Sequence, residues 1–499
     1  MYFLGLDIGS TVLKAAIFDL DGNELGIYGE LAETYSPKPG YYERDLSELW
    51  AANIDAIKGA IKNAGIDGNE ISAISLTGHG NGAHLLDADL QPVRRAIEGA
   101  DSRALPYLEI LDSEGYYDKI HPQNMQVLWP ALSLVLMRWL KENEPDSYEK
   151  SRYFLTAHDY IRFKLTGELR AEISCISGTG LINTKEQRID QEMLKLGGIE
   201  EVADMLPPLI GSFEEAGKIT SEVADLTGLK KGTPVFGGCY DIDAASLATG
   251  SIDESRITII VGTWANNQYI GQTPIVAKEF FSTTIFSRPG YYLMLEGSPT
   301  SASNLEWFIG EFLQEEKKLA EETGASIYDL CNNAVRELAP EDSNLVYLPF
   351  IYGSNVNPLA QGSFIGLQGW YERRHVIRAI YEGICFSHRF HIEKLLKYLS
   401  PPKAARIAGG GARSDEWGQM FADILQMPIE VTKSTELGAL GAAICAAIGS
   451  GHYASIDEAI AGMVKTTKVF TQDTSKKSIY DKKYSRYLKA IDALDGYWE

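Results

Sequence analysis

The spacing of apolar and polar residues at the start of the chain predicts a β-hairpin. Residues 2–6 and 12–18 are rich in aliphatic side chains, and the polar segment 7–11 (DIGST) separates them. A turn of the Asp-Gly kind at residues 19–23 ends the second strand. We therefore expect two antiparallel strands joined by a short polar bend.

The rest of the chain alternates amphipathic helices with short apolar strands. We expect helices over residues 46–64 behind an Asp45 cap, 129–141, 159–165, 244–248, 376–399, 416–425 and 437–449. We expect strands over residues 71–76, 233–238, 257–261 and 405–408. The strand at 257–261 is followed by a polar bend and a returning strand. This pattern repeats the first hairpin about halfway along the chain. This pattern predicts an α/β protein of two similar domains, residues 1–248 and 249–499.

Length and charge narrow the class of protein. A chain of 499 residues with 45% apolar side chains exceeds the roughly 250–300 residues at which one core stops growing. The net charge of −22 opposes binding to nucleic acids and anionic membranes. The five cysteines form no CxxC pair, and no apolar run is long enough to span a membrane. We expect a cytoplasmic protein without disulfides, structural zinc or a targeting segment.

The bend at residues 7–11 has the composition of a phosphate-binding loop. Gly9 and its neighbours offer backbone N–H groups, Ser10 and Thr11 offer hydroxyls, and Lys14 on the returning strand offers a cation. Asp7 repels phosphate oxygens unless a divalent metal stands between them, so we expect Asp7 to hold Mg²⁺ with a nucleotide, directly or through water. An ordinary polar hairpin turn is the alternative.

Two further glycine-containing bends follow apolar strands. Gly262 and Thr263 lie in the second hairpin, where we expect them to contact phosphates. The third bend consists of Gly409, Gly410, Gly411 and Ala412. Consecutive glycines let the backbone approach a flat ligand, and the helix that follows offers free N–H groups. We expect this third bend to contact the adenosine of ATP.

The motifs DIGSTVLK at 7–14, the GTW bend and GGGARSDEWGQMFADILQMPI at 409–429 resemble the FGGY carbohydrate kinases, which share the ATPase fold of actin, Hsp70 and hexokinase. The resemblance covers nearly the whole chain. TAHDY at 156–160, SPTSASNLEWF at 298–308 and LPFIYGSN at 348–355 are most similar to the L-xylulose kinase group. The resemblance implies two actin-like ATPase (ribonuclease H-like) domains with an interdomain cleft, and ATP and Mg²⁺ as cofactors. It also implies a small neutral sugar as acceptor, a pentulose such as L-xylulose, with erythritol or another polyol as the alternative.

Phosphoryl transfer to a sugar hydroxyl is helped by a base that accepts its proton. Asp241 lies after the strand at 233–238 and just before the predicted domain boundary. In the family pattern an aspartate precedes two alanines by three and four positions, and this pattern selects Asp241 as well. We interpret its rival, Asp243, as the N-cap of the following helix.

The segment TGHGNGAHLLD contains the candidate sugar site. Its GxGxG motif precedes a strand rather than a helix, which argues against a dinucleotide fingerprint. By resemblance the sugar contacts fall on Gly80 and Asn81, with Asp101 as a further candidate, and a glycine-rich turn without a ligand is the alternative. His79 and His84 have no third residue with ligand spacing nearby, so we expect exposed or hydrogen-bonded histidines rather than metal ligands.

The fold implied by the resemblance also serves chaperones and filament proteins, in which the nucleotide drives a change in the shape of the protein and no small acceptor is phosphorylated. A sugar-sensing relative is a third hypothesis. Asp241 and the segment with Asn81 favour the enzyme. We expect a small-molecule sugar as partner, neither nucleic acid nor membrane, and a homodimer as the candidate assembly.

Overall fold

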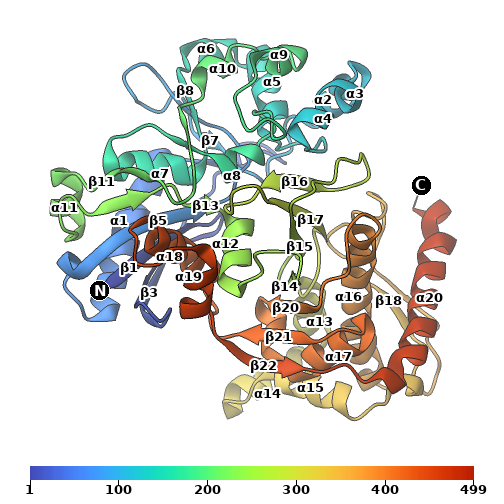
Figure 1. The fold of residues 1–499 in the computed structure, drawn as a ribbon. Helices are drawn as coiled ribbons and strands as arrows, with labels where there is room; N and C mark the ends of the chain where they lie inside the picture. The colour runs from blue at the N-terminus through green and yellow to red at the C-terminus, as the bar shows by residue number, and fades with distance from the viewer. Residues whose placement is uncertain (499) are drawn as a thin grey trace. The chain divides into compact units, whose positions relative to one another are not determined.

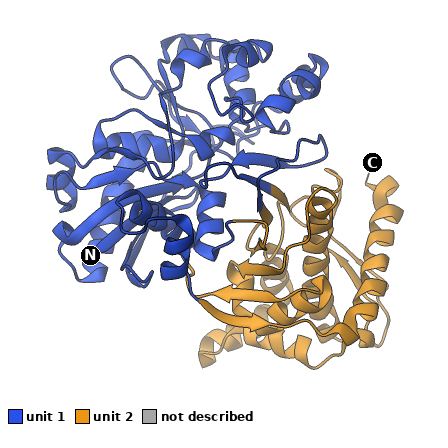
Figure 2. Cartoon of the chain, in the orientation of Figure 1, with its two compact units in different colours: residues 1–252, 270–294, 436–465 blue, residues 253–269, 295–435, 466–499 orange. Residues whose placement is uncertain are grey.

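A computed structural model describes residues 1–498, which fold into two compact units (Figure 1, Figure 2). Unit 1 comprises residues 1–252, 270–294 and 436–465, and the remaining segments form unit 2. The units are therefore interleaved along the chain, and the contiguous domains 1–248 and 249–499 stay a prediction. Within the described residues no helix is both long enough and apolar enough to cross a membrane.

A mixed sheet in the order β11-β12-β5-β1-β2-β3 forms the centre of unit 1. Its strands are β1 (Tyr2–Ile8), β2 (Val12–Phe18), β3 (Glu24–Leu31), β5 (Ile71–Gly78), β11 (Glu215–Lys218) and β12 (Pro234–Phe236), and β13 (Cys239–Tyr240) also pairs with β5. β1 runs antiparallel to β2 and parallel to β5, and β5 runs parallel to β12 and β13. The predicted hairpin is confirmed, but its first strand continues to Ile8, so the bend is shorter than expected.

The second large sheet contains the order β17-β15-β14-β20-β21-β22, which repeats this arrangement, and β16 (Ser282–Ile285) pairs with β17 at its edge. Its strands are β14 (Arg256–Val261), β15 (Ala265–Gly271), β17 (Tyr292–Ser298), β20 (Ala404–Ala408), β21 (Ile429–Thr432) and β22 (Thr466–Phe470). β14 is antiparallel to β15 and parallel to β20, just as β1 is antiparallel to β2 and parallel to β5. The α/β class is confirmed, and the shared strand order supports two similar halves.

The helices begin and end close to the positions that local sequence predicts. The main helices of unit 1 are α1 (Leu46–Ala64), α5 (Ser133–Asn143), α7 (Ala157–Thr166), α8 (Ile173–Ser177), α12 (Asp241–Thr249) and α18 (Leu437–Gly449). Those of unit 2 include α13 (Ser303–Phe312), α16 (Arg373–Leu396), α17 (Asp415–Leu425) and α20 (Lys477–Leu494). Asp45 caps α1 by accepting from the backbone of Ser47 and Glu48, as predicted. The prediction for α5 is wrong at its start, because Trp129 precedes the helix by four positions.

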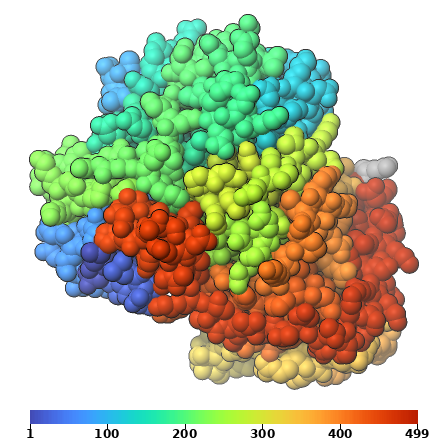
Figure 3. Space-filling model, viewed as in Figure 1, coloured from blue at the N-terminus to red at the C-terminus, as the bar shows by residue number. Residues whose placement is uncertain are grey.

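Helix α18 comes from the second half of the chain but belongs to unit 1. It packs on β1, β5 and α12, and Figure 3 shows red-orange atoms of residues 436–465 beside the dark-blue N-terminal strands. The approach is close because the helix is built from small residues: a Cβ at Gly441 would overlap the backbone of Ala244. Close packing on a sheet is thus confirmed, and the sheet is that of the first half.

Candidate active site

Three strands of unit 1 carry candidate residues at their carboxyl ends. β1 and β13 both pair with β5 in parallel, and both Asp7 and Cys239 lie opposite Thr77 in these pairings. The Thr77 hydroxyl donates to the backbone oxygen of Cys239 at 2.8 Å, which fixes β13 against β5. Carboxyl ends of parallel strands meet at one edge of a sheet, where ligands of α/β proteins bind. The topology therefore brings Asp7, the segment after β5 and Asp241 to the same edge.

Asp7 and Asp241 are partly exposed carboxylates with raised pKa values. Loss of hydration raises the pKa of Asp241 to about 7, and the negative charge of Asp7 adds to this rise. Loss of hydration also raises the pKa of Asp7 to about 6, although nearby Lys14 opposes the change. Oδ1 of Asp241 accepts no hydrogen bond from any described residue. A carboxylate that titrates near neutral pH and has a free oxygen is suited to accept a proton.

Asp241 is the first residue of α12, whose N-cap is Tyr240. The prediction that Asp243 caps this helix is wrong. Asp243 lies inside the first turn, is buried, and accepts hydrogen bonds from the backbone N–H and the hydroxyl of Ser287 at 2.7 and 2.8 Å. The helix begins three residues earlier than a cap at this position requires, and the Asp243 side chain is buried. Asp241 instead occupies the helix N-terminus.

A buried carboxylate that sequence reasoning missed supports the backbone next to Asp241. Glu172 accepts hydrogen bonds from the backbone of Ser174 and Cys175 and from the hydroxyls of Ser174 and Ser212. The Ser174 hydroxyl in turn accepts from the backbone N–H of Tyr240 at 3.0 Å. Burial raises the pKa of Glu172 to about 7. The sequence signal is only a local cap of α8, and nothing local links it to residue 240.

The bend at residues 7–11, which is predicted to bind phosphate, is held by a residue that the sequence analysis did not single out. Arg44 is buried and donates to the backbone oxygens of Gly9 and Ser10. Lys14 lies opposite Asp7 in the β1–β2 register and pairs with Glu436, just before α18, at 2.8 Å. The roles of Gly9, Ser10, Thr11 and Lys14 toward phosphate stay a prediction. In this structure the Lys14 ammonium is neutralised by Glu436.

The segment after β5 meets the residue that precedes Asp241. Asn81 Nδ2 donates to the Tyr240 hydroxyl at 3.4 Å, and its Oδ1 has no hydrogen-bond partner among residues 1–498. A Cβ at Gly80 would lie 2.9 Å from the Tyr240 ring, so the ring needs glycine there. Gly80 and Asn81 thus lie beside the predicted base, and their contact with a sugar stays a prediction.

In unit 2 the two remaining glycine bends lie together. The hairpin bend with Gly262 and Thr263 joins β14 to β15, and residues 409–412 follow the parallel neighbour β20. Gly409 has φ 86°, and a Cβ there would lie 2.7 Å from the backbone oxygen of Val261. Only glycine suits this combination of left-handed backbone and close approach. The strand ends of unit 2 therefore carry both predicted nucleotide-binding bends, as the strand ends of unit 1 carry Asp7 and Asp241.

Comparison with known families settles the class of protein. Residues 2–248 match the N-terminal domain of the FGGY family of carbohydrate kinases, and residues 257–450 match its C-terminal domain. The chain belongs to the FGGY family of carbohydrate kinases. It is therefore a carbohydrate kinase, a phosphotransferase that uses ATP and an alcohol group of a sugar as acceptor.

Individual FGGY kinases resemble this one over its whole length. The L-xylulose/3-keto-L-gulonate kinase of Escherichia coli is 36% identical over 499 residues, which cover 99% of this chain and 98% of that protein. A probable L-xylulose kinase of Haemophilus influenzae is also 36% identical and covers 99% of each chain. The crystal structure of xylulose kinase from Rhodospirillum rubrum superposes with a TM-score of 0.90 at 26% identity and covers 100% of both chains.

Asp101 of this carbohydrate kinase has both oxygens engaged by its own chain. They accept from the Arg103 backbone and guanidinium and from the backbone N–H of Tyr42 at 2.7 Å. The Asp101 side chain is buried, and these hydrogen bonds hold the backbone around Arg103 in place. Contact between Asp101 and a sugar stays a prediction.

The expectation for the two histidines of the kinase's TGHGNGAHLLD segment is met by His79 but not in full by His84. His79 is hydrogen-bonded, because its Nδ1 lies 3.1 Å from the backbone oxygen of Asn81. His84 is not exposed: it is buried, neither ring nitrogen makes a hydrogen bond of good geometry with a described residue, and the Leu155 backbone acts on the ring only weakly. The structure also places Glu98 beside both rings, a neighbour that spacing in the sequence did not indicate.

Proposed function

We propose that this carbohydrate kinase transfers the γ-phosphoryl group of ATP, with Mg²⁺, to a hydroxyl of a small neutral sugar, a pentulose such as L-xylulose. The observation that carries the pentulose is the 36% identity, over nearly the full length, to the L-xylulose/3-keto-L-gulonate kinase and the probable L-xylulose kinase named above. Asn81 supports it, because a neutral amide with an unpartnered oxygen suits a polyhydroxylated acceptor without charge.

Asp241 acts as the base in this proposal. Its raised pKa lets it take the proton of the sugar hydroxyl as the oxygen bonds to phosphorus. Tyr240 and the Glu172–Ser174 hydrogen bonds hold the backbone on the N-terminal side of Asp241, so the carboxylate is positioned by a buried network. Asn81 orients the sugar beside it.

Mg²⁺ fits the residues at the end of β1. Asp7 is a partly exposed carboxylate in the same bend as the predicted phosphate contacts, and Mg²⁺ prefers oxygen ligands and retains water. Asp7 would hold the ion, directly or through water. The ion supplies charge neutralisation to the phosphate oxygens. Gly9, Ser10, Thr11 and Lys14 bind phosphate from unit 1, Gly262 and Thr263 bind phosphate, and residues 409–412 bind adenosine.

A coupled ADP-release assay tests the acceptor. L-Xylulose, D-xylulose, erythritol, glycerol and 3-keto-L-gulonate are compared by kcat/KM at fixed ATP and Mg²⁺. We expect the neutral pentuloses first, erythritol second and glycerol last, with the acidic sugar below the pentuloses. ADP release that no sugar stimulates would contradict the proposed reaction, and a preference for the acidic sugar would contradict the neutral acceptor.

Asn81→Leu tests the position of the sugar. Sites that hydrogen-bond a hydroxyl discriminate strongly when a partner is lost, so we expect the pentulose KM to rise by roughly tenfold or more. Slow sugar-free ATP hydrolysis should change little. Asn69→Leu is the matched control, because Asn69 is exposed just before the other end of β5. Equal pentulose KM values for the two variants would place the sugar elsewhere.

A further inference from the structure

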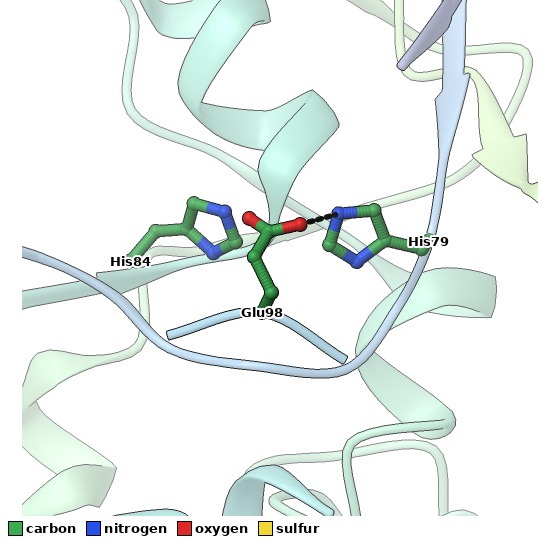
Figure 4. A group of neighbouring side chains, drawn as sticks. All are labelled: His79, His84 and Glu98. Carbon is green, nitrogen blue, oxygen red and sulfur yellow. Dashed lines mark ion pairs between the residues drawn. The ribbon is translucent and has the colours of Figure 1, made fainter. Parts of the chain in front are cut away.

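Three potential metal ligands converge next to the segment that carries Asn81. His79 follows β5, His84 begins β6 (His84–Leu86), and Glu98 follows β7 (Ala96–Ile97). Their ligand atoms lie within 4.8 Å of one another. Figure 4 shows the carboxylate of Glu98 between the two imidazole rings. His84 and Glu98 are only 1% and 3% exposed, so bulk water does not solvate them.

The hydrogen bond of His79 determines where its proton lies. Nδ1 faces the backbone oxygen of Asn81 at 3.1 Å, and a carbonyl oxygen can only accept, so Nδ1 carries the hydrogen. In the neutral ring Nε2 is then an acceptor, and it faces Oε2 of Glu98 at 3.5 Å. Two acceptors that face each other away from water need a proton or a cation between them.

His84 brings further ring nitrogens to the carboxylate of Glu98. Neither of its ring nitrogens, nor Oε1 of Glu98, makes a hydrogen bond of good geometry with a described residue. Metal ions bind the neutral form of an imidazole, through Nδ1 or Nε2. The Leu155 backbone interacts with the ring, which satisfies at most one of its two nitrogens. A buried imidazole nitrogen without a partner is rare, because it loses its water without compensation.

The neighbouring charged residues do not supply the cation that His79, His84 and Glu98 require. The Arg44 guanidinium lies 3.3 Å from Oε2 of Glu98 and is also shared by the backbone oxygens of Gly9 and Ser10. It balances Glu98 on one side only, since Oε1 stays unpartnered. His158 is a further neighbour, and burial lowers its pKa to about 4, so it brings no positive charge.

We propose that His79, His84 and Glu98 form a binding site for a divalent transition-metal ion of the Zn²⁺ class. Two imidazoles and one carboxylate are ligands that Zn²⁺ binds at about 2.0–2.2 Å, with a fourth position for water. Tetrahedral ligands at that distance lie about 3.4 Å apart, so binding draws the three side chains together. Mg²⁺ prefers oxygen ligands, which makes this site distinct from the one at Asp7.

The ion would fix the sugar-binding segment from its inner side. His79 is separated from Asn81 by a single residue and is hydrogen-bonded to its backbone, so a metal on Nε2 holds the Asn81 backbone in place. A ligating histidine typically donates its other N–H to a carbonyl or a carboxylate, as Nδ1 does here. The site does not depend on which sugar is phosphorylated.

Metal analysis of the full-length protein tests the proposal. The purified chain is dialysed against Zn²⁺ in the presence of excess Mg²⁺, desalted, and its zinc measured by mass spectrometry. We expect one Zn²⁺ per chain, and the Co²⁺-loaded protein should show the intense visible absorption of a four-coordinate site. A wild-type protein that retains no zinc, or whose Co²⁺ spectrum is that of the six-coordinate aqueous ion, overturns the proposal.

Variants place the ion on the named residues. Glu98→Gln and His84→Gln should weaken Zn²⁺ binding by roughly tenfold or more, as loss of one ligand does, while His452→Gln is the matched control and should bind like the parent. Far-UV circular dichroism identifies any variant that fails to fold, and the wild-type Co²⁺ spectrum decides the question in that case. Folded Glu98→Gln and His84→Gln proteins that retain one Zn²⁺ at parental affinity would refute the assignment. Nitrogen NMR that finds His79 doubly protonated in zinc-treated protein would show a proton in place of the metal.

Discussion

The pH dependence of the reaction follows from the environment of Asp241. A base must be deprotonated to accept a proton, and a pKa of about 7 means that the free enzyme loses the active form as the pH falls through neutrality. With that pKa about 3% of Asp241 is charged at pH 5.5 and about 97% at pH 8.5. We therefore expect kcat/KM to rise about 30-fold over this interval and to level off above pH 8.

An aspartate with an unshifted pKa would give a different pH profile of kcat/KM, so the measurement distinguishes the two cases. At the usual pKa of 3.8, Asp241 would be about 98% charged at pH 5.5, so kcat/KM would stay flat over the same interval. The assay is ADP release at limiting substrate from pH 5.5 to 8.5, with the coupling enzymes in excess at every pH. A flat profile would refute the reasoning about burial and the charge of Asp7.

Substitution separates Asp241 from the other groups that titrate. Asp241→Asn keeps the shape of the side chain and removes the base, so kcat should fall by roughly 10²-fold or more and the acidic limb should disappear. A limb that persists in this variant belongs to another titrating group, such as Asp7, whose pKa is raised to about 6, or the phosphates of ATP. Asp243→Asn is the control, because an amide oxygen can still accept from Ser287. Near-parental turnover by Asp241→Asn would remove the residue from the mechanism.

Three further predictions concern the nucleotide bends and the packing of α18. Lys14→Ala should weaken ATP and ADP binding more than AMP binding in calorimetry, and equal losses would place the ammonium away from the phosphates. Gly409→Ala should raise the KM for ATP and destabilise unit 2 by about 1–3 kcal/mol in urea unfolding, because its φ is 86°. Gly410→Ala meets no protein atom within 4 Å, so it should leave the free energy of unfolding unchanged. Gly441→Val should lower both Tm and kcat, since its side chain would overlap Ala244 in α12, and an unchanged Tm would contradict this packing.

Local patterns in the sequence determined much of the secondary structure of this kinase, its glycine bends and its family. The first hairpin, α1 with its Asp45 cap and the strand at β5 could be predicted because alternation, helical spacing and caps act over a few neighbouring residues. The glycine bends could be found for the same reason: each follows its own strand directly. The family also follows from such motifs, which are contiguous in the chain.

Only the tertiary structure decided which distant residues meet. Helix α18 packs on the first sheet although more than 400 residues separate it from β1, and Glu436 at its start reaches Lys14. Asp243 lies inside a helix turn and bonds Ser287, so its capping pattern misled the prediction. Glu98 lies beside His79 and His84 because the fold brings the end of β7 close to the end of β5 and the start of β6. Such contacts depend on the packing of strands and helices far apart in the chain, and no local periodicity encodes them.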